Sequence, residues 1–176
     1  LLDTVQQAFG MIPNTAKMMA NSPAVLESFL VFSTAMAKAQ IGSKLHNQLK
    51  LTTSETNSCS YCTSILSAVA PSVGLTAEDV LAGRTADSED RRTKASLTFA
   101  NDVLASRGKV TAQQLADVRG AGFGDTEIVE IVASVVLGCL TNFLNNVADT
   151  ELDIPRAEPI EACSASTCGA EACSTH

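Results

Sequence analysis

The sequence predicts an all-α fold, and three observations support this. Hydrophobic residues make up 45% of the 176 residues, which is enough for one domain to bury a sizeable core. Aromatic residues make up only 4% and Trp is absent, so the core must consist mainly of Ala, Leu, Val, Ile and Met, a mixture that favours helices. No stretch shows the alternation of a β-strand. We therefore expect one helical domain.

Each expected helix is bounded by residues that start or stop helices. The first carries an apolar stripe at spacings of four, three and four: Val25, Phe29, Phe32 and Met36. Thr76 and Thr111 each open a later helix, with Asp or Gln three residues on as in a capping box. Helix-breaking residues separate the expected helices, at Gly42, Asn57-Ser58, Gly74, Gly83, Gly108 and Gly120. We therefore predict helices over 23–39, 43–56, 59–74, 76–83, 87–108, 111–120 and 125–148.

The charge and hydropathy of the chain argue against two classes of partner. A formal net charge of −7 repels a phosphate backbone, so we expect no nucleic acid partner. No apolar run reaches the roughly 18 residues that span a bilayer, so we expect no membrane partner. No signal peptide is recognised, and we expect a cytoplasmic protein.

The sharpest chemical feature is the Cys59-x-x-Cys62 pair at the predicted start of a helix. With Ser58 as the N-cap, the helix dipole and free backbone N–H groups favour a thiolate at Cys59, and Cys62 lies one turn on, within disulfide reach. Two alternatives stay open: both cysteines are small core residues, or they are half of a zinc site. Cys139, in an apolar stretch, is interpreted as a buried small hydrophobic residue.

The residues around this pair resemble a known family. The stretch LTTSETNSCSYC (51–62) resembles the core motif of the AhpD-like alkylhydroperoxidase and carboxymuconolactone decarboxylase superfamily. Further matching pieces follow the family order: FGMIPN (9–14), NSPA (21–24), LTFA (97–100), VRGAGF (118–123), DTEI (125–128), NFLNNVA (142–148) and LD (152–153). The resemblance implies an all-α domain of roughly seven to nine helices that assembles as a homotrimer or homohexamer.

The resemblance also implies chemistry at the dithiol. Members with Cys-x-x-Cys are thiol peroxidases or disulfide reductases, so Cys59 and Cys62 are the candidate catalytic residues, and no cofactor is required. The resemblance makes Cys62 the peroxidatic thiol, whereas the dipole argument makes Cys59 the more acidic one. The family motif has a Glu and a His where this chain has Asn47 and Leu66, so its proton relay is missing. His46 and Glu55 are the candidate replacements.

A different composition marks the end of the chain. We expect the helical domain to cover residues 1–155 and a Cys-rich tail to cover 156–176. The candidate metal ligands of this tail are Cys163, Cys168, Cys173 and His176, a set suited to zinc or copper. The alternatives are exposed thiols, disulfides that hold the tail against the body, and a tail cysteine that resolves a mixed disulfide at Cys59.

Two functions follow. The first is a thiol-based antioxidant oxidoreductase that reduces a peroxide or disulfide through Cys59 and Cys62, with an atypical proton relay and an unknown thiol electron donor. The alternative is a catalytically degenerate member that acts as a scaffold, or as a metal-thiolate or redox-sensing protein, through the same pair and the tail.

Overall fold

The fold consists entirely of helices in the described part of the chain. The structure, a computed structural model, describes residues 1–160. Its elements are α1 (Leu2–Phe9), α2 (Asn14–Met19), α3 (Pro23–Met36), α4 (Gly42–Thr56), α5 (Ser60–Val69), the 3₁₀-helix η1 (Ala70–Val73), α6 (Ala77–Thr85), α7 (Arg91–Ser106), α8 (Ala112–Gly120) and α9 (Asp125–Ala148). Nine α-helices and no strand within residues 1–160 confirm the predicted fold class.

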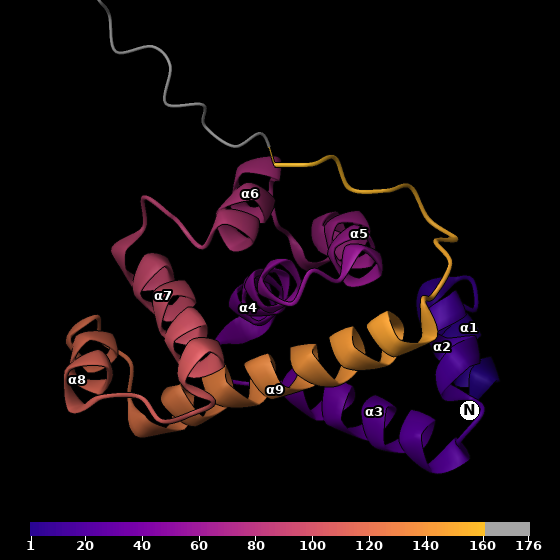
Figure 1. The fold of residues 1–176 in the computed structure, drawn as a ribbon, viewed down its shortest axis with the longest axis horizontal. Coiled ribbons are helices and arrows are strands. Elements are labelled where there is room, and N and C mark those ends of the chain that lie inside the picture. Colours follow the sequence, from indigo (N-terminus) through magenta and orange to yellow (C-terminus); the bar gives the residue numbers. More distant parts are fainter. Residues whose placement is uncertain (161–176) are drawn as a thin grey trace, which may run out of the picture.

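Helix α4 occupies the centre of the molecule. It contacts α5, α6, α7 and α9, and Figure 1 shows it lying between α9 on one side and α5, α6 and α7 on the other sides. Its buried face is unusually polar, because His46, Asn47, Gln48, Thr52 and Thr53 are all buried. The adjoining apolar core contains Leu49, Leu97, Phe99, Ala100, Val118, Ile131 and Val135. A central helix with buried polar side chains is where a chemical site can be built without leaving the core.

Two glycines let neighbouring helices approach α4 closely. A Cβ at Gly138 of α9 would lie 2.9 Å from Cγ2 of Thr53. A Cβ at Gly83 of α6 would lie 3.1 Å from the Cα of Gln48. The Thr52 hydroxyl uses this proximity to donate to the Gly83 carbonyl at 2.6 Å. The small residues therefore hold α9 and α6 against the polar face of α4.

The predicted helix starts are largely confirmed. Thr76 and Thr111 form capping boxes with Asp79 and Gln114, and α3 begins at Pro23 as expected. Three main differences are found. Helix α7 begins at Arg91, after its N-cap Asp90, and not at residue 87 as predicted. Helices α1 and α2 precede the first helix that the pattern predicted, and the helix after the dithiol ends in a 3₁₀ turn before Gly74.

Helix α9 has the predicted bounds but is more apolar than the sequence analysis expected. Over 24 residues it is, by length and composition alone, apolar enough to cross a membrane, whereas we expected no such run. In the structure it packs against α4, α7, α3 and α5, and 39% of its apolar 18-residue stretch is buried. Its apolar character therefore serves, at least in part, the core of the helical domain.

The chain after α9 forms a C-terminal strap, defined here as residues 150–160. Figure 1 shows the strap leaving the end of α9 near α1 and α2 and crossing past α5 to α6. The Asp153 carboxylate accepts from the backbone N–H of Asn14 at 2.6 Å, and Ala157 N–H donates to Ser64 Oγ at 3.0 Å. The strap crosses residue 155, and the division predicted there stays a prediction.

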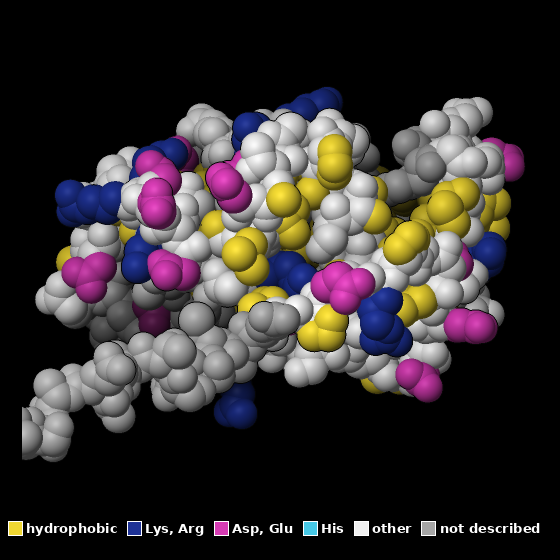
Figure 2. All heavy atoms as spheres, turned by 90° about the horizontal axis from the view of Figure 1, so that it is seen from above, with side chains coloured by type: hydrophobic (Ala, Val, Ile, Leu, Met, Phe, Trp, Pro, Cys, Tyr) yellow, Lys and Arg dark blue, Asp and Glu magenta, His cyan; other side chains and the backbone are white. Residues whose placement is uncertain are grey.

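Acidic and basic side chains are intermixed on the face that carries the strap. Figure 2 shows them lying among exposed apolar side chains rather than gathered into one large patch of a single sign. Four ion pairs connect charges within residues 1–160, for example Arg92–Glu127 and Lys94–Asp87.

Candidate active site

The dithiol lies at the turn between α4 and α5. Ser58 adopts the left-handed conformation (φ 52°) and turns the chain, and Cys59 follows as the N-cap of α5. Its Sγ accepts from the Cys62 backbone N–H at 3.4 Å. The expectation that Ser58 is the N-cap was therefore wrong, because the sharp turn uses Ser58 as its left-handed residue and moves the cap one position on. Both cysteines are free thiols and are buried.

The two thiols differ in acidity. Hydrogen bonding from Cys59 lowers the pKa of Cys62, and the amides of Asn142 and Asn145 and the hydroxyl of Thr141 add to this against the opposing effect of burial. The Asn145 amide donates to Cys62 Sγ at 3.2 Å. The same thiol–thiol bond and burial raise the pKa of Cys59. This order is opposite to the helix-dipole expectation, because the thiol–thiol hydrogen bond favours the charged form of Cys62 and the donors on α9 add to that effect.

An asparagine network joins the dithiol turn to α9. Asn57 donates to Asn142 Oδ1 at 3.0 Å, and Asn142 donates to Ser54 Oγ at 3.0 Å. Asn57 also reaches Cys139 Sγ at 3.6 Å. Cys139 is half-buried rather than buried as the sequence analysis expected, since its stretch of α9 turns partly outward. The network fixes the position of the turn relative to the donors of Cys62.

Cys62 lines an apolar cavity of about 220 Å³. Its apolar wall comes from the N-terminal helices and from α5: Val5, Pro13, Phe29, Leu30, Ile65, Leu66 and Val69. Tyr61 also lines it and is fixed by donating to Asp153 Oδ1 at 2.8 Å. The thiol with the lowered pKa is therefore placed at the wall of a cavity suited to an apolar ligand.

His46, predicted as a relay residue, lies in this cavity. Its Nδ1 is 2.8 Å from Ser134 Oγ, and only 9% of the residue is exposed. Burial, and after it the charge of Lys50, lowers the pKa of His46 to about 4. The imidazole is therefore neutral near pH 7 and is able to accept a proton, but weakly.

Lys50 is a site residue that the sequence analysis missed. It lines the same cavity as Cys62, and burial lowers its pKa, while the nearby Cys62 thiolate opposes that shift. No ion pair to Lys50 is found within residues 1–160. A signal was present in the sequence: Lys50 follows His46 by four residues, one helical turn, so the two side chains share a face of α4.

The positions that depart from the family motif lie in this cavity too. Asn47 and Leu66 both line it. Asn47 Oδ1 is buried and, in the described part of the chain, has no hydrogen-bond partner; the same is true of Asn145 Oδ1 and Thr15 Oγ1. A buried acceptor without a partner is costly unless a ligand or water satisfies it. These three oxygens give an otherwise apolar cavity specific points for recognising a donor group.

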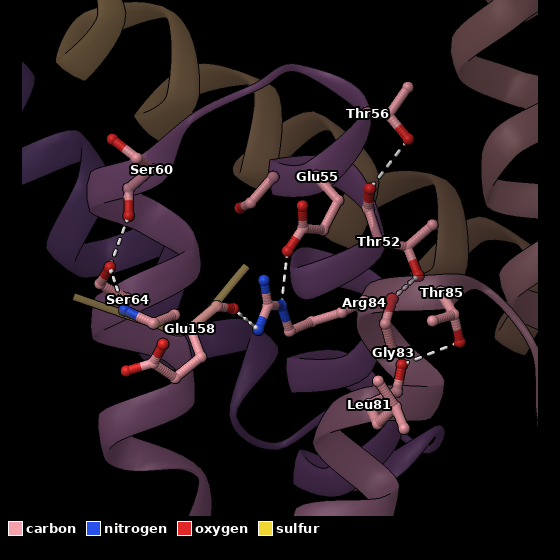
Figure 3. Close-up of polar contacts among 12 residues, drawn as sticks. Thr52, Glu55, Thr56, Ser60, Ser64, Leu81, Gly83, Arg84, Thr85 and Glu158 are labelled. Carbon is pink, nitrogen blue, oxygen red and sulfur yellow. Dashed lines mark hydrogen bonds and ion pairs between the residues drawn. The ribbon is translucent and has the colours of Figure 1, made fainter. Parts of the chain in front are cut away.

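Glu55, the other predicted relay residue, lies elsewhere. It pairs with Arg84 Nε at 2.5 Å, and Arg84 also donates to the Glu158 carbonyl of the strap at 2.8 Å, as Figure 3 shows. Glu55 lines a separate polar cleft of about 290 Å³ together with Cys59. The structure therefore places His46 with Cys62 and Glu55 with Cys59, on two different cavities.

The predicted metal ligands of the tail lie outside the described residues. Cys163, Cys168, Cys173 and His176 all fall after residue 160. Among the residues that the structure describes, no group of three or more His, Cys, Asp or Glu side chains is arranged to hold a metal ion.

Comparison with known proteins rests on structure, since no family model and no curated protein matches the sequence. An uncharacterized peroxidase-related protein with an AhpD core from Ralstonia eutropha JMP134 superposes with a TM-score of 0.77 at 21% identity, over 85% of this chain and 82% of that one. A peroxidase-related protein from Silicibacter sp. TM1040 gives 0.69 at 20% identity, over 85% and 80%. The debrominase Bmp8 in complex with 2,3,4-tribromopyrrole gives 0.73 at 19% identity, over 85% and 82%. The chain therefore has the AhpD-like fold of these peroxidase-related proteins and carries a Cys59–Cys62 pair.

Proposed function

We propose that the protein is a thiol-dependent peroxidase that reduces organic hydroperoxides. The observation that carries this proposal is the position of Cys62, whose pKa is lowered and which lines an apolar cavity. A thiolate is the nucleophile that peroxides require, and a dry apolar wall accepts the organic part of a hydroperoxide.

The reaction balances with the two thiols alone. The Cys62 thiolate attacks the outer oxygen of R–O–OH, the O–O bond breaks, and the alkoxide leaves as an alcohol after taking a proton. The product at Cys62 is a sulfenic acid. The Cys59 thiol then attacks this sulfur, water leaves, and a Cys59–Cys62 disulfide forms. Because both electrons come from the dithiol, the proposed reaction requires no cofactor.

Lys50 is our candidate for the missing acid of the relay. Its side chain lines the cavity of Cys62, and its lowered pKa makes it release a proton more readily than an ordinary lysine. An ammonium there also stabilises the negative charge of the Cys62 thiolate and of the departing alkoxide. His46 is less available as a proton donor than Lys50 in this position, because burial favours the neutral form of its imidazole.

The direct test is peroxide reduction by the dithiothreitol-reduced protein, with cumene hydroperoxide and hydrogen peroxide compared. We expect a higher kcat/KM for cumene hydroperoxide, loss of turnover in Cys62→Ser, and a loss of about 10²-fold or more in Lys50→Met. Cys139→Ser, a half-buried thiol outside the cavity, is the matched control and should retain turnover. Absence of turnover with both peroxides would contradict the proposal and favour the scaffold or redox-sensing alternative.

A second candidate is reductive removal of bromine from a small aromatic ring. The debrominase Bmp8, bound to 2,3,4-tribromopyrrole, has a similar fold. The unpartnered Asn47 and Asn145 oxygens in the apolar cavity offer acceptors for a ring N–H. In this reaction C–H replaces C–Br, bromide leaves, and the two thiols become a disulfide. The test is bromide release from 2,3,4-tribromopyrrole. The parent protein should release bromide and Cys62→Ser should not, and no release by the parent would contradict this second function.

A further inference from the structure

His46 lines the cavity of Cys62 and is held there by α9. Its Nδ1 lies 2.8 Å from Ser134 Oγ, and the same hydroxyl donates to the Glu130 carbonyl at 2.8 Å, one turn earlier on α9. Ser134 is fully buried and does not itself line the cavity. The imidazole is therefore oriented by a hydrogen-bonded chain that lies outside the cavity.

This chain fixes the tautomer of His46. A backbone carbonyl only accepts, so the Ser134 hydroxyl must place its single hydrogen between the two oxygens that lie 2.8 Å apart. Ser134 Oγ can then only accept from His46, and Nδ1 must carry the ring hydrogen. Burial also favours the neutral imidazole. Nε2 is left with a lone pair, and within residues 1–160 it has no hydrogen-bond partner.

Nε2 joins a set of free acceptors in this cavity. Asn47 Oδ1 and Asn145 Oδ1 are buried there and have no partner in the described part of the chain. Asn145 holds Cys62 Sγ with the nitrogen of the same amide, at 3.2 Å. Lys50 adds a cation to the lining. The cavity therefore offers acceptors to an O–H or N–H group and a cation to an oxygen that gains negative charge.

We propose that Ser134 is a positioning residue that keeps His46 in its Nδ1–H tautomer, and that Nε2 of His46 binds the O–H of the substrate hydroperoxide. This inference rests on the proposed function, because it names the contact that orients the peroxide towards Cys62. A dialkyl peroxide, which has carbon in place of that hydrogen, should be rejected at the same contact.

The contact agrees with the balance of the proposed reaction. The outer oxygen, which Cys62 Sγ attacks, carries the hydrogen that Nε2 holds. When the S–O bond forms and the O–O bond breaks, this hydrogen stays on the outer oxygen and becomes the O–H of the sulfenic acid. The inner oxygen leaves as the alkoxide and takes its proton from Lys50. His46 neither gains nor loses a proton, as expected of an imidazole that burial keeps neutral.

The first measurement is the tautomer. The chain contains two histidines, so in His176→Gln the NMR resonances of ¹⁵N-labelled imidazole report on His46 alone. The full chain is used with all six cysteines replaced by serine, so that no thiol consumes peroxide. We expect a protonated Nδ1 and an unprotonated Nε2 near pH 7. Ser134→Ala should give a mixture of the two tautomers.

Ser96→Ala is the matched control for this measurement. Ser96 is also fully buried in a helix, and its hydroxyl donates to the Thr93 carbonyl at 2.7 Å, away from the cavity. Circular dichroism shows that each variant is folded. The His46 resonances of Ser96→Ala should match those of the parent, so that loss of a buried serine hydroxyl by itself does not explain the change in Ser134→Ala.

The second measurement is the contact with the ligand in the same cysteine-free chain. Cumene hydroperoxide should bind about tenfold more tightly than cumyl methyl peroxide, in which a methyl group replaces the hydrogen. Only the hydroperoxide should shift the Nε2 resonance towards that of a hydrogen-bonded nitrogen. His46→Phe, which keeps a flat ring without nitrogen, should bring the two dissociation constants to within about threefold of each other.

Several results would overturn the proposal. They are an Nε2–H tautomer in the parent, absence of hydroperoxide binding, and an Nε2 resonance that saturating hydroperoxide leaves unmoved. A preference for the hydroperoxide that persists in His46→Phe would assign the O–H to another acceptor and overturn it too. Turnover is measured separately on the chain with its cysteines: turnover without the Nε2 contact overturns this inference alone, whereas the contact without turnover overturns the peroxidase proposal alone.

Discussion

Asn145 offers the most direct test of how α9 controls the reactivity of the dithiol. Its amide donates to Cys62 Sγ at 3.2 Å and also to the Thr141 carbonyl at 2.9 Å. A hydrogen bond to a charged group contributes about 1.5–3 kcal/mol, and one pKa unit corresponds to about 1.4 kcal/mol. Because the amide is shared, we expect Asn145→Ala to raise the pKa of Cys62 by about 1, which lowers the thiolate fraction below that pKa about tenfold.

The assay is the pH dependence of iodoacetamide alkylation at Cys62, resolved from the other cysteines by peptide mass spectrometry of the reduced protein. Asn146→Ala is the matched control, since the next residue of α9 donates to the Asn57 carbonyl instead of a sulfur. Circular dichroism and urea unfolding show that both variants are folded. An unchanged Cys62 profile in Asn145→Ala, or an equal shift in Asn146→Ala, would refute the reasoning.

Three further outcomes are expected. The pKa of His46 is about 6.5 in the unfolded state and about 4 in the folded state, so the unfolded state binds the proton first as the pH drops. The free energy of unfolding should therefore fall between these two pH values, by up to roughly 3 kcal/mol. Urea unfolding of His46→Gln should show a smaller loss over the same range. Ser58→Gly should raise the urea midpoint, by about 0.5–1 kcal/mol in unfolding free energy, since φ is 52°; an unchanged midpoint would contradict the strain. Val129, Val136 and Phe143 form an exposed stripe at seven-residue spacing on α9, and we expect self-association there that Phe143→Glu abolishes in sedimentation velocity, whereas a monomeric parent would disprove it.

Most of the fold was predictable because it depends on local rules. Capping boxes at Thr76 and Thr111 act within one helical turn, so they could be found without knowing what packs against them. The Cys59–Cys62 spacing likewise places both thiols within one turn of each other at the start of α5. The identity of the N-cap was not predictable, because it depends on which residue of the turn adopts a positive φ.

The chemistry of the pair was decided by tertiary contacts. Which sulfur is the more acidic depends first on the hydrogen bond between the two thiols, and then on the amides of Asn142 and Asn145, some eighty residues away on α9. Lys50 lines the cavity of Cys62, whereas Glu55 pairs with Arg84 in the other cleft, because the packing of α4 turns these side chains towards different cavities. Helical periodicity fixes which residues share a face of one helix, but only the packing of the other helices decides what each face meets.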